Sequence, residues 1–264
     1  MARLEPPADS PLGSEPIPTS QDVQVIRRVV KDFAVLPFVQ ARIRNNVVNL
    51  TVPFSQGLFW KGMLNCLISS CHGVGPHTRA QRFSEEQPFP LTLDQVRTEG
   101  REIIHKRLVE RGVSRFPLRV ARMASQNFVR LEEGRWEEVK SWHIVLAGQR
   151  CRNPNSNDFK AERDAARFVD LNFAGFGPKQ SRNLWQILGL TRFEVPIDRR
   201  VLHWIDLHLS LKVAPEELLR PTSYERVLNY LQRACLIADI VPCVLDAVVF
   251  ALGSRELRRK TRSN

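Results

Sequence analysis

One short glycine-rich segment restricts the fold of this 264-residue chain more than any other part of it. It reads Phe173-Ala-Gly-Phe-Gly-Pro-Lys-Gln-Ser-Arg-Asn-Leu-Trp185, with apolar residues before the glycines and an amphipathic helical pattern after them. Gly175 and Gly177 allow a tight turn with positive φ and leave backbone N–H groups unobstructed. Pro178 suits the first position of a helix, where its missing N–H would have no intrahelical acceptor. The segment therefore predicts a turn that leads directly into a helix.

Such a turn is a ready phosphate site, because the free N–H groups and the dipole of the following helix both favour an anion. The layout is that of a helix-hairpin-helix DNA-binding motif over about residues 161–189, although an ordinary glycine-rich helical hairpin in a core has the same pattern. Short glycine motifs recur by chance, so the pattern alone does not decide between the two. On the DNA-binding interpretation, Gly175, Gly177 and Gln180 are expected to contact the DNA backbone.

The rest of the chain has the apolar spacing of helices, so we predict an all-α fold. Thr92 and Gln95 have the spacing of a capping box that begins a helix. Thr222 and Glu225 have the same spacing. Only residues 47–54 are compatible with a strand. The expected helices cover residues 54–70, 92–111, 116–131, 136–146, 161–171, 222–238 and 241–252.

The charge of the chain points to a polyanionic partner. Its 39 Lys and Arg against 28 Asp and Glu give a net charge of +11, and the isoelectric point is near 10.0. Nucleic acid is the first expectation for such a protein. The five cysteines are an odd number at irregular spacings, which argues against structural zinc, a disulfide framework and an iron–sulfur cluster. We expect no metal and no other cofactor.

The two ends differ in composition from the region between them. Residues 1–20 hold five prolines among serine and glycine, which predicts a disordered leader. Residues 255–264 form a basic tail, and residues 21–254 remain for one domain. The apolar runs are too short to span a membrane, and the N-terminus lacks the apolar stretch of a secretory signal. We therefore expect an intracellular protein with no membrane partner, cytoplasmic and nucleoid-associated if the source is prokaryotic.

Two charged residues stand near the hairpin. Asp198 follows the run Val195-Pro-Ile197 and is expected to be the N-cap of the next helix, where its side chain accepts backbone N–H groups and the dipole helps to keep it ionised. Lys179 lies nineteen residues earlier. One helix and one turn are enough to bring the two side chains back beside each other.

This arrangement resembles the helix-hairpin-helix DNA glycosylase superfamily, in which a hairpin is followed by a loop and an Asp at a helix start. Lys179 is similar in position to the lysine of the 8-oxoguanine glycosylase/lyase members. Two further segments resemble the archaeal-type 8-oxoguanine glycosylase, namely residues 63–69 and residues 241–253. The resemblance touches most of residues 38–253.

The resemblance implies a fold of two helical subdomains with the active-site cleft between them. It also implies a bifunctional DNA glycosylase/AP lyase that excises 8-oxoguanine from duplex DNA. Lys179 would be the nucleophile that forms a Schiff base with the sugar before β-elimination. Asp198 would stabilise the cationic sugar as the base departs. The expected partner is double-stranded DNA with a damaged base, bound by a monomer.

The same resemblance suggests which residues handle the extruded base. Asp246 and Phe250 match an Asp and an aromatic residue of the archaeal type, and their i,i+4 spacing places them on one helix face. Gln40 matches a glutamine that reads the base. The chain departs from that type in having Phe250 where a Trp is expected, and Asn183 is also unusual for the family.

Two alternatives remain open at this point: a non-enzymatic helix-hairpin-helix DNA-binding module, and a glycosylase of the same fold for another damaged base. A module that only binds DNA does not need Lys179 to be paired with Asp198. Cys71 and His72 occupy a place where related enzymes fill the gap left by the flipped base. Four tryptophans are expected in the core: Trp60, Trp136, Trp142 and Trp185.

Overall fold

The computed structural model describes residues 16–49, 51–70, 79–149 and 156–262. These residues form α-helices and short helical turns and contain no strand, which confirms the predicted all-α fold. The helices are α1 (Ser20–Phe33), α2 (Pro37–Arg42), α3 (Gln56–Ser70), α4 (Arg79–Glu85), α5 (Leu93–Glu99), α6 (Glu102–Glu110), α7 (Pro117–Arg130), α8 (Trp136–Gln149), α9 (Ser156–Asn172), α10 (Pro178–Ile187), α11 (Arg199–His208), α12 (Pro221–Ile237) and α13 (Pro242–Arg262). Short π-helical turns, Ile43–Val48 and Leu131–Arg135, and a 3₁₀ turn, Pro215–Leu219, lie between them.

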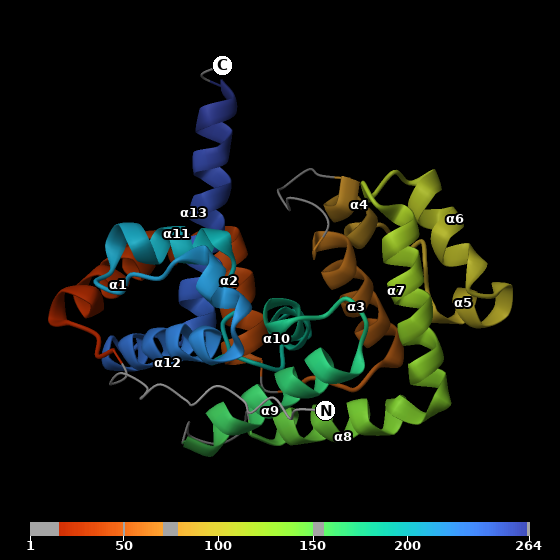
Figure 1. The fold of residues 1–264 in the computed structure, drawn as a ribbon, viewed down its shortest axis with the longest axis horizontal. Coiled ribbons are helices and arrows are strands. Elements are labelled where there is room, and N and C mark those ends of the chain that lie inside the picture. Colours follow the sequence, from red (N-terminus) through yellow and green to blue (C-terminus); the bar gives the residue numbers. More distant parts are fainter. Residues whose placement is uncertain (1–15, 50, 71–78, 150–155, 263–264) are drawn as a thin grey trace, which may run out of the picture.

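The helices pack around two separate hydrophobic cores, which form the two subdomains seen side by side in Figure 1. The first core is built by α3 to α10, and the second by α1, α2, α11, α12 and α13. The described part of the chain therefore begins and ends in the second subdomain and forms the first one between. This confirms the expected pair of helical subdomains. In Figure 1, α10 lies near the boundary between them.

The hairpin helices α9 and α10 belong to the first subdomain. The indole N–H of Trp185 on α10 donates a 2.8 Å hydrogen bond to the carbonyl of Ala165 on α9, inside the core. Trp185, Trp60 and Trp136 are buried, and Trp142 packs half-buried against the same core, as predicted.

The predicted helix over residues 92–111 is divided in the structure. Its capping box is confirmed, because Thr92 and Gln95 exchange hydrogen bonds between side chain and backbone. The helix then stops at Gly100, which has φ +84°, a conformation that ends a helix and that glycine adopts without strain. A separate helix, α6, follows.

Three other local predictions are wrong. Thr222 does not cap a helix, because Pro221 already occupies the first helical position of α12 and no side chain caps that end. The described residues of the ambiguous strand, 47–49 and 51–54, form no strand, and the first two belong to a π-helical turn. The last helix, α13, continues beyond its predicted end at Leu252.

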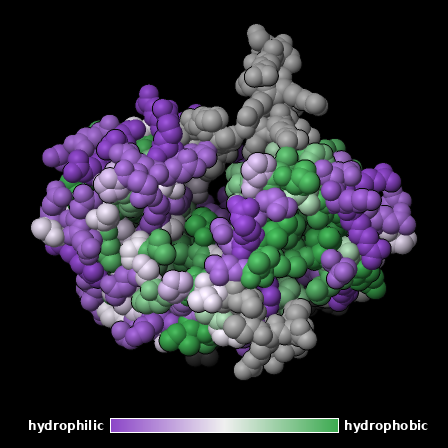
Figure 2. Space-filling view, turned by 180° about the vertical axis from the view of Figure 1, so that it is seen from behind, coloured by the Kyte–Doolittle hydropathy of each residue, from purple (hydrophilic) through white to green (hydrophobic). Residues whose placement is uncertain are grey.

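Residues 1–15 of the predicted leader lie outside the described residues, as do Cys71 and His72. Helix α1 starts at Ser20, capped by Thr19, whose hydroxyl accepts the N–H of Asp22. No single helix in the described ranges is long and apolar enough to cross a bilayer. Helices α12 and α13 pass that test only as a pair, with a bend of 105° between them, and both line the second core. The exterior seen from behind carries wide hydrophilic areas beside hydrophobic ones (Figure 2).

Candidate active site

The turn between α9 and α10 is tightly held by the first subdomain. Gly175 has φ +82°, and a Cβ at this position would lie 2.5 Å from Sδ of Met123 and 2.6 Å from Cδ2 of Leu67. Asn127 on α7 binds the turn from both sides: its Nδ2 donates to the carbonyl of Ala174 at 3.0 Å, and its Oδ1 accepts the N–H of the same residue at 2.6 Å. Only glycine fits at position 175, as the sequence predicts.

Gly177 plays a different part from the one predicted. Its φ of −133° and ψ of −175° are extended backbone, so the expectation of a positive φ is wrong for this glycine. It is the N-cap of α10, and a Cβ there would meet no atom within 4 Å. The first helical bond runs from the N–H of Ser181 to the carbonyl of Gly177. The earlier N–H groups of Lys179 and Gln180 have no intrahelical acceptor, so this end of α10 can bind an anion.

The side chain of Gln180 is turned inward. It is 6% exposed, its Nε2 donates to Oγ of Ser69 at 3.4 Å, and its Oε1 accepts from Nδ2 of Asn183 at 3.3 Å. Asn183 also donates to Sγ of the buried Cys66 at 3.6 Å. The unusual Asn183 therefore joins α10 to α3, and Gln180 can offer a DNA phosphate its backbone N–H while its side chain stays buried.

Buried carboxylates fix the loop that leads from α10 to Asp198. Glu162 on α9 accepts the backbone N–H groups of residues 192–194 at 2.7 to 2.9 Å, and burial raises the pKa of its carboxyl to about 8. Arg182 on α10 donates through Nε to Glu194 at 2.7 Å, inside the protein. These contacts hold the start of α11 against the hairpin.

Asp198 is the N-cap of α11, as predicted. Its Oδ1 accepts the backbone N–H of Arg200 at 2.8 Å and that of Val201 at 3.1 Å. Nζ of Lys179 lies 3.7 Å from its Oδ2, which confirms that the two residues meet at adjoining helix N-termini. The side chain of Lys179 is 33% exposed and that of Asp198 is 16% exposed, so the pair is partly buried but can still be reached from solvent.

A third charged group, Arg200, shares this ion pair. Its Nε donates to Oδ2 of Asp198 at 3.0 Å, and its Nη2 donates to the same oxygen. Burial by itself would raise the pKa of the Asp198 carboxyl, but the hydrogen bond and charge of Arg200, the charge of Lys179 and the N–H of Val201 hold that pKa below its usual value. Asp198 is therefore ionised at neutral pH.

Asp246 and Phe250 lie on α13 beside this cluster. Asp246 is 9% exposed, and burial raises the pKa of its carboxyl to about 6, while the charge of Arg42 on α2 opposes that rise. Asp198, Arg200 and Lys179 also act on its charge, so both carboxylates belong to one electrostatic cluster.

The ring of Phe250 is covered by two neighbours. Phe38 on α2 stacks on it with a centroid distance of 4.8 Å and an angle of 23° between the rings. The guanidinium carbon of Arg200 lies over it at 4.4 Å from the centroid. The predicted base-stacking residue is therefore next to the lysine–aspartate pair.

Gln40 is not brought to this cluster. Phe38 and Arg42 occupy one face of α2 by their i,i+4 spacing, and a residue two positions from each faces elsewhere. The Gln40 amide instead donates through Nε2 to the carbonyl of Ala34 at 2.7 Å, between α1 and α2.

Three residues of the cluster were not predicted as site residues: Phe38, Arg42 and Arg200. Arg200 stands two positions after the N-cap, where a side chain can reach back to the capping carboxylate, and this local signal was available. Phe38 and Arg42 flank Gln40 in the sequence, but nothing local distinguishes them from it.

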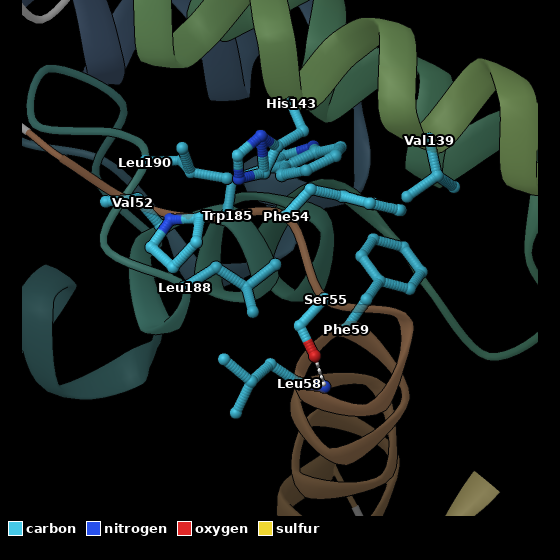
Figure 3. A pocket seen from close by; sticks show the side chains of 11 residues that line it. Val52, Phe54, Ser55, Leu58, Phe59, Val139, His143, Trp185, Leu188 and Leu190 are labelled. Atoms are coloured by element: carbon cyan, nitrogen blue, oxygen red, sulfur yellow. Dashed lines mark hydrogen bonds between the residues drawn. The ribbon is translucent and has the colours of Figure 1, made fainter. Parts of the chain in front are cut away.

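Among the described side chains, no three His, Cys, Asp or Glu residues lie close enough to hold a metal ion. The apolar pocket in Figure 3 has a volume of about 30 Å³, too small for a base, and includes the buried ring of His143. It lies at the other end of α10, by Leu188, roughly 14 Å along the helix direction from Lys179.

Among solved structures, the chain is similar to the Methanocaldococcus jannaschii 8-oxoguanine glycosylase/lyase, crystallised in complex with a 15mer DNA containing 8-oxoguanine. The TM-score is 0.61 at 14% sequence identity, and the alignment covers 86% of this chain and 96% of that one. No family model and no curated protein sequence matches the chain. The similarity extends over both subdomains, and the chain therefore has the all-helical fold of that glycosylase/lyase.

Proposed function

We propose that the protein is a bifunctional DNA glycosylase/AP lyase that removes 8-oxoguanine from duplex DNA. The observation that carries the proposal is the approach of Nζ of Lys179 to 3.7 Å from Asp198 at two adjoining helix N-termini. A module that only grips the DNA backbone has no use for a half-buried amine and carboxylate at this place. The shared fold with a glycosylase/lyase supports the same class of enzyme.

In the proposed reaction the damaged nucleotide leaves the duplex stack, because the C1′–N bond is otherwise inaccessible. Nζ of Lys179 loses a proton and attacks C1′ with the freed lone pair, the bond from C1′ to the base breaks, and the base departs with the electron pair and takes up a proton. Ionised Asp198 stabilises the positive charge on the sugar during this step.

The lyase step follows from the covalent bond to Lys179. The secondary ammonium at C1′ loses one proton, the bond from C1′ to the ring oxygen opens and that oxygen takes up a proton, which leaves a protonated imine between Nζ and C1′. Loss of a proton from C2′ then expels the 3′ phosphate and nicks the strand. None of these steps requires a cofactor.

The extruded base is held, in this proposal, by Asp246 and Phe250. Phe250 offers a ring for stacking, and Asp246 offers a carboxyl whose pKa of about 6 allows it to accept or donate a proton near neutral pH. Gln40 can assist only if its amide leaves the carbonyl of Ala34. The Phe250→Ala change should weaken base stacking by about 1–3 kcal/mol.

In this proposal the hairpin provides the contacts to the DNA backbone. Gly175 forms the tight turn, and the open position of Gly177 beside the N–H of Gln180 leaves the end of α10 accessible to a phosphate. Because the protein carries a net charge of +11, affinity for undamaged duplex should fall steeply between about 50 and 200 mM salt.

Borohydride trapping on an 8-oxoguanine duplex tests the reaction. The wild-type protein should form a stable covalent adduct, and Lys179→Gln should abolish it while retaining DNA binding. The matched control is Lys160→Gln, because Lys160 also pairs with an aspartate, Asp164, but on the solvent face with 77% of its side chain exposed. Asp198→Asn should slow base release by about 10²–10³-fold.

Each other outcome points to a different function. Trapping by Lys179→Gln would mean that another amine is the nucleophile, and base release without trapping would mean that water is. Excision of a different lesion would keep the fold and chemistry but change the substrate. DNA binding without any excision would leave only the non-enzymatic module.

A further inference from the structure

Arg200 lies in an electrostatically unfavourable place for a cation. It is the second residue of α11, where the positive end of the helix dipole disfavours a positive side chain. Its counter-charge is Asp198, to which Nε and Nη2 both donate, and its side chain remains 29% exposed. The guanidinium is therefore held by one carboxylate and lies within reach of solvent.

With Arg200 in this position, Asp198 has little capacity left for a substrate. A carboxylate offers about four acceptor positions. Oδ1 accepts two backbone N–H groups, and Oδ2 accepts two donors from Arg200 and lies 3.7 Å from Lys179. A cationic sugar at C1′ would have to compete with Arg200 for the same oxygen.

The same guanidinium also covers the ring on which a base would stack. It lies 4.4 Å from the centroid of Phe250, whose ring is stacked on Phe38 as well. The aliphatic part of Arg200 runs along α13, where a Cβ on Gly253 would be 3.4 Å from its Cδ. A base that stacks on Phe250 must take the place of one of the two groups that now cover it.

We propose that Arg200 is a positioning residue that occupies Asp198 and Phe250 in the free protein and leaves both when a base enters. Entry of a base then frees Oδ2 of Asp198 for the sugar, so the site becomes active through base insertion and not through DNA binding alone. This inference rests on the proposed glycosylase/lyase function. A DNA phosphate offers Arg200 a new partner, because a guanidinium binds phosphate as well as it binds carboxylate.

The two substrates of the proposed enzyme separate this role from a purely structural one. An abasic site contains no base to displace Arg200, whereas an 8-oxoguanine duplex does. We therefore compare the single-turnover rate of borohydride trapping on abasic duplex with the rate on 8-oxoguanine duplex, at saturating protein. Arg200→Gln should raise this ratio by about tenfold, the rate equivalent of one charge-assisted hydrogen bond. Arg199→Gln, which removes the same charge from the neighbouring exposed residue, should leave the ratio unchanged.

A second measurement follows Arg200 directly. The Nε–H signal of Arg200 in an NMR spectrum can be assigned by its absence in Arg200→Gln. In the free protein this signal should show the hydrogen bond to Asp198. In the Lys179→Gln background it should persist with undamaged duplex and change with 8-oxoguanine duplex. A signal that is identical in both complexes overturns the inference.

The kinetic outcomes are also distinct. If the wild-type protein traps normally, two results overturn this inference alone. One is an abasic to 8-oxoguanine rate ratio that is unchanged in Arg200→Gln, and the other is an equal increase of that ratio in Arg199→Gln. Wild-type protein that traps on neither substrate overturns the proposed function and this inference with it.

Discussion

Replacing Asp246 with asparagine should raise the free energy of unfolding above pH 7, although the change removes an ionisable group from the candidate site. Burial raises the pKa of this carboxyl from 3.8 to about 6, against the opposing charge of Arg42. That difference of about 2 pH units corresponds to roughly 3 kcal/mol against the ionised form. Asparagine has the same shape and no charge, so it avoids this penalty, less the smaller penalty of burying an amide.

The pH dependence has a definite sign. A raised carboxyl pKa means that the folded protein binds the proton more tightly than the unfolded chain, so this group stabilises the protein most below pH 4. That stabilisation is lost as the pH rises from about 4 to 7. Above pH 7 the contribution of this group to the free energy of unfolding no longer changes. The advantage of Asp246→Asn over the wild type should therefore shrink by about 1.4 kcal/mol, or roughly half, between pH 8 and pH 5.

Urea unfolding of both proteins at pH 5 and pH 8 measures this change, and equal m-values would show that both unfold to the same extent. Asp206→Asn is the control, because Asp206 is on α11 with 59% of its side chain exposed and should show little effect at either pH. Two results would refute the assignment of an ionised, poorly compensated Asp246. One is a difference in unfolding free energy between Asp246→Asn and wild type that is the same at both pH values. The other is an Asp246→Asn variant that is less stable than wild type at pH 8.

Three further changes test how the hairpin and the second core are held. Gly175→Ala should destabilise the protein by about 2–3 kcal/mol in urea unfolding, because it combines a positive φ with a collision at Met123. The control, Gly148→Ala, lies in an open helical position and should be neutral or slightly stabilising. Asn127→Ala removes both hydrogen bonds to the hairpin turn and should lower the unfolding free energy by about 2–3 kcal/mol, with faster hydrogen exchange at the turn. Tyr230→Phe removes a 2.7 Å hydrogen bond to a buried aspartate and should lower Tm at pH 7, at a loss of about 1–3 kcal/mol.

The parts of the site that could be predicted from the sequence depend on residues close together along the chain. Asp198 caps α11 through N–H groups two and three residues later, so its own neighbours decide its conformation. Its approach to Lys179 follows from one helix and one turn. Gly175 was also predictable, because a turn of this length needs a positive φ, but the pattern could not show that Gly177 is extended.

The parts that could not be predicted depend on contacts between segments that are distant in the sequence. Phe38 stacks on Phe250 because α2 packs against α13, and Arg42 acts on Asp246 for the same reason. The periodicity of a six-residue helix does not reveal which of its faces meets a partner, so Gln40 was predicted from the family resemblance and its neighbours were not predicted at all. Arg200 could have been suspected from its distance to the N-cap, but its contact with Phe250 needs the tertiary structure.

The charges gathered at the site explain why a protein would keep this arrangement in spite of its cost in stability. Arg42, Lys179 and Arg200 act on Asp246, and the last two also act on Asp198, so three cations face two carboxylates. One positive charge remains uncompensated above pH 6, beside the free N–H groups of α10. A third carboxylate would balance the cluster but would also repel a nucleic acid. A DNA phosphate at the hairpin supplies the missing negative charge, and it gives Arg200 a partner other than Asp198 once a base has displaced that side chain. The same excess of positive charge that weakens the free protein thus favours the bound state, in which Lys179 and Asp198 are left to act together.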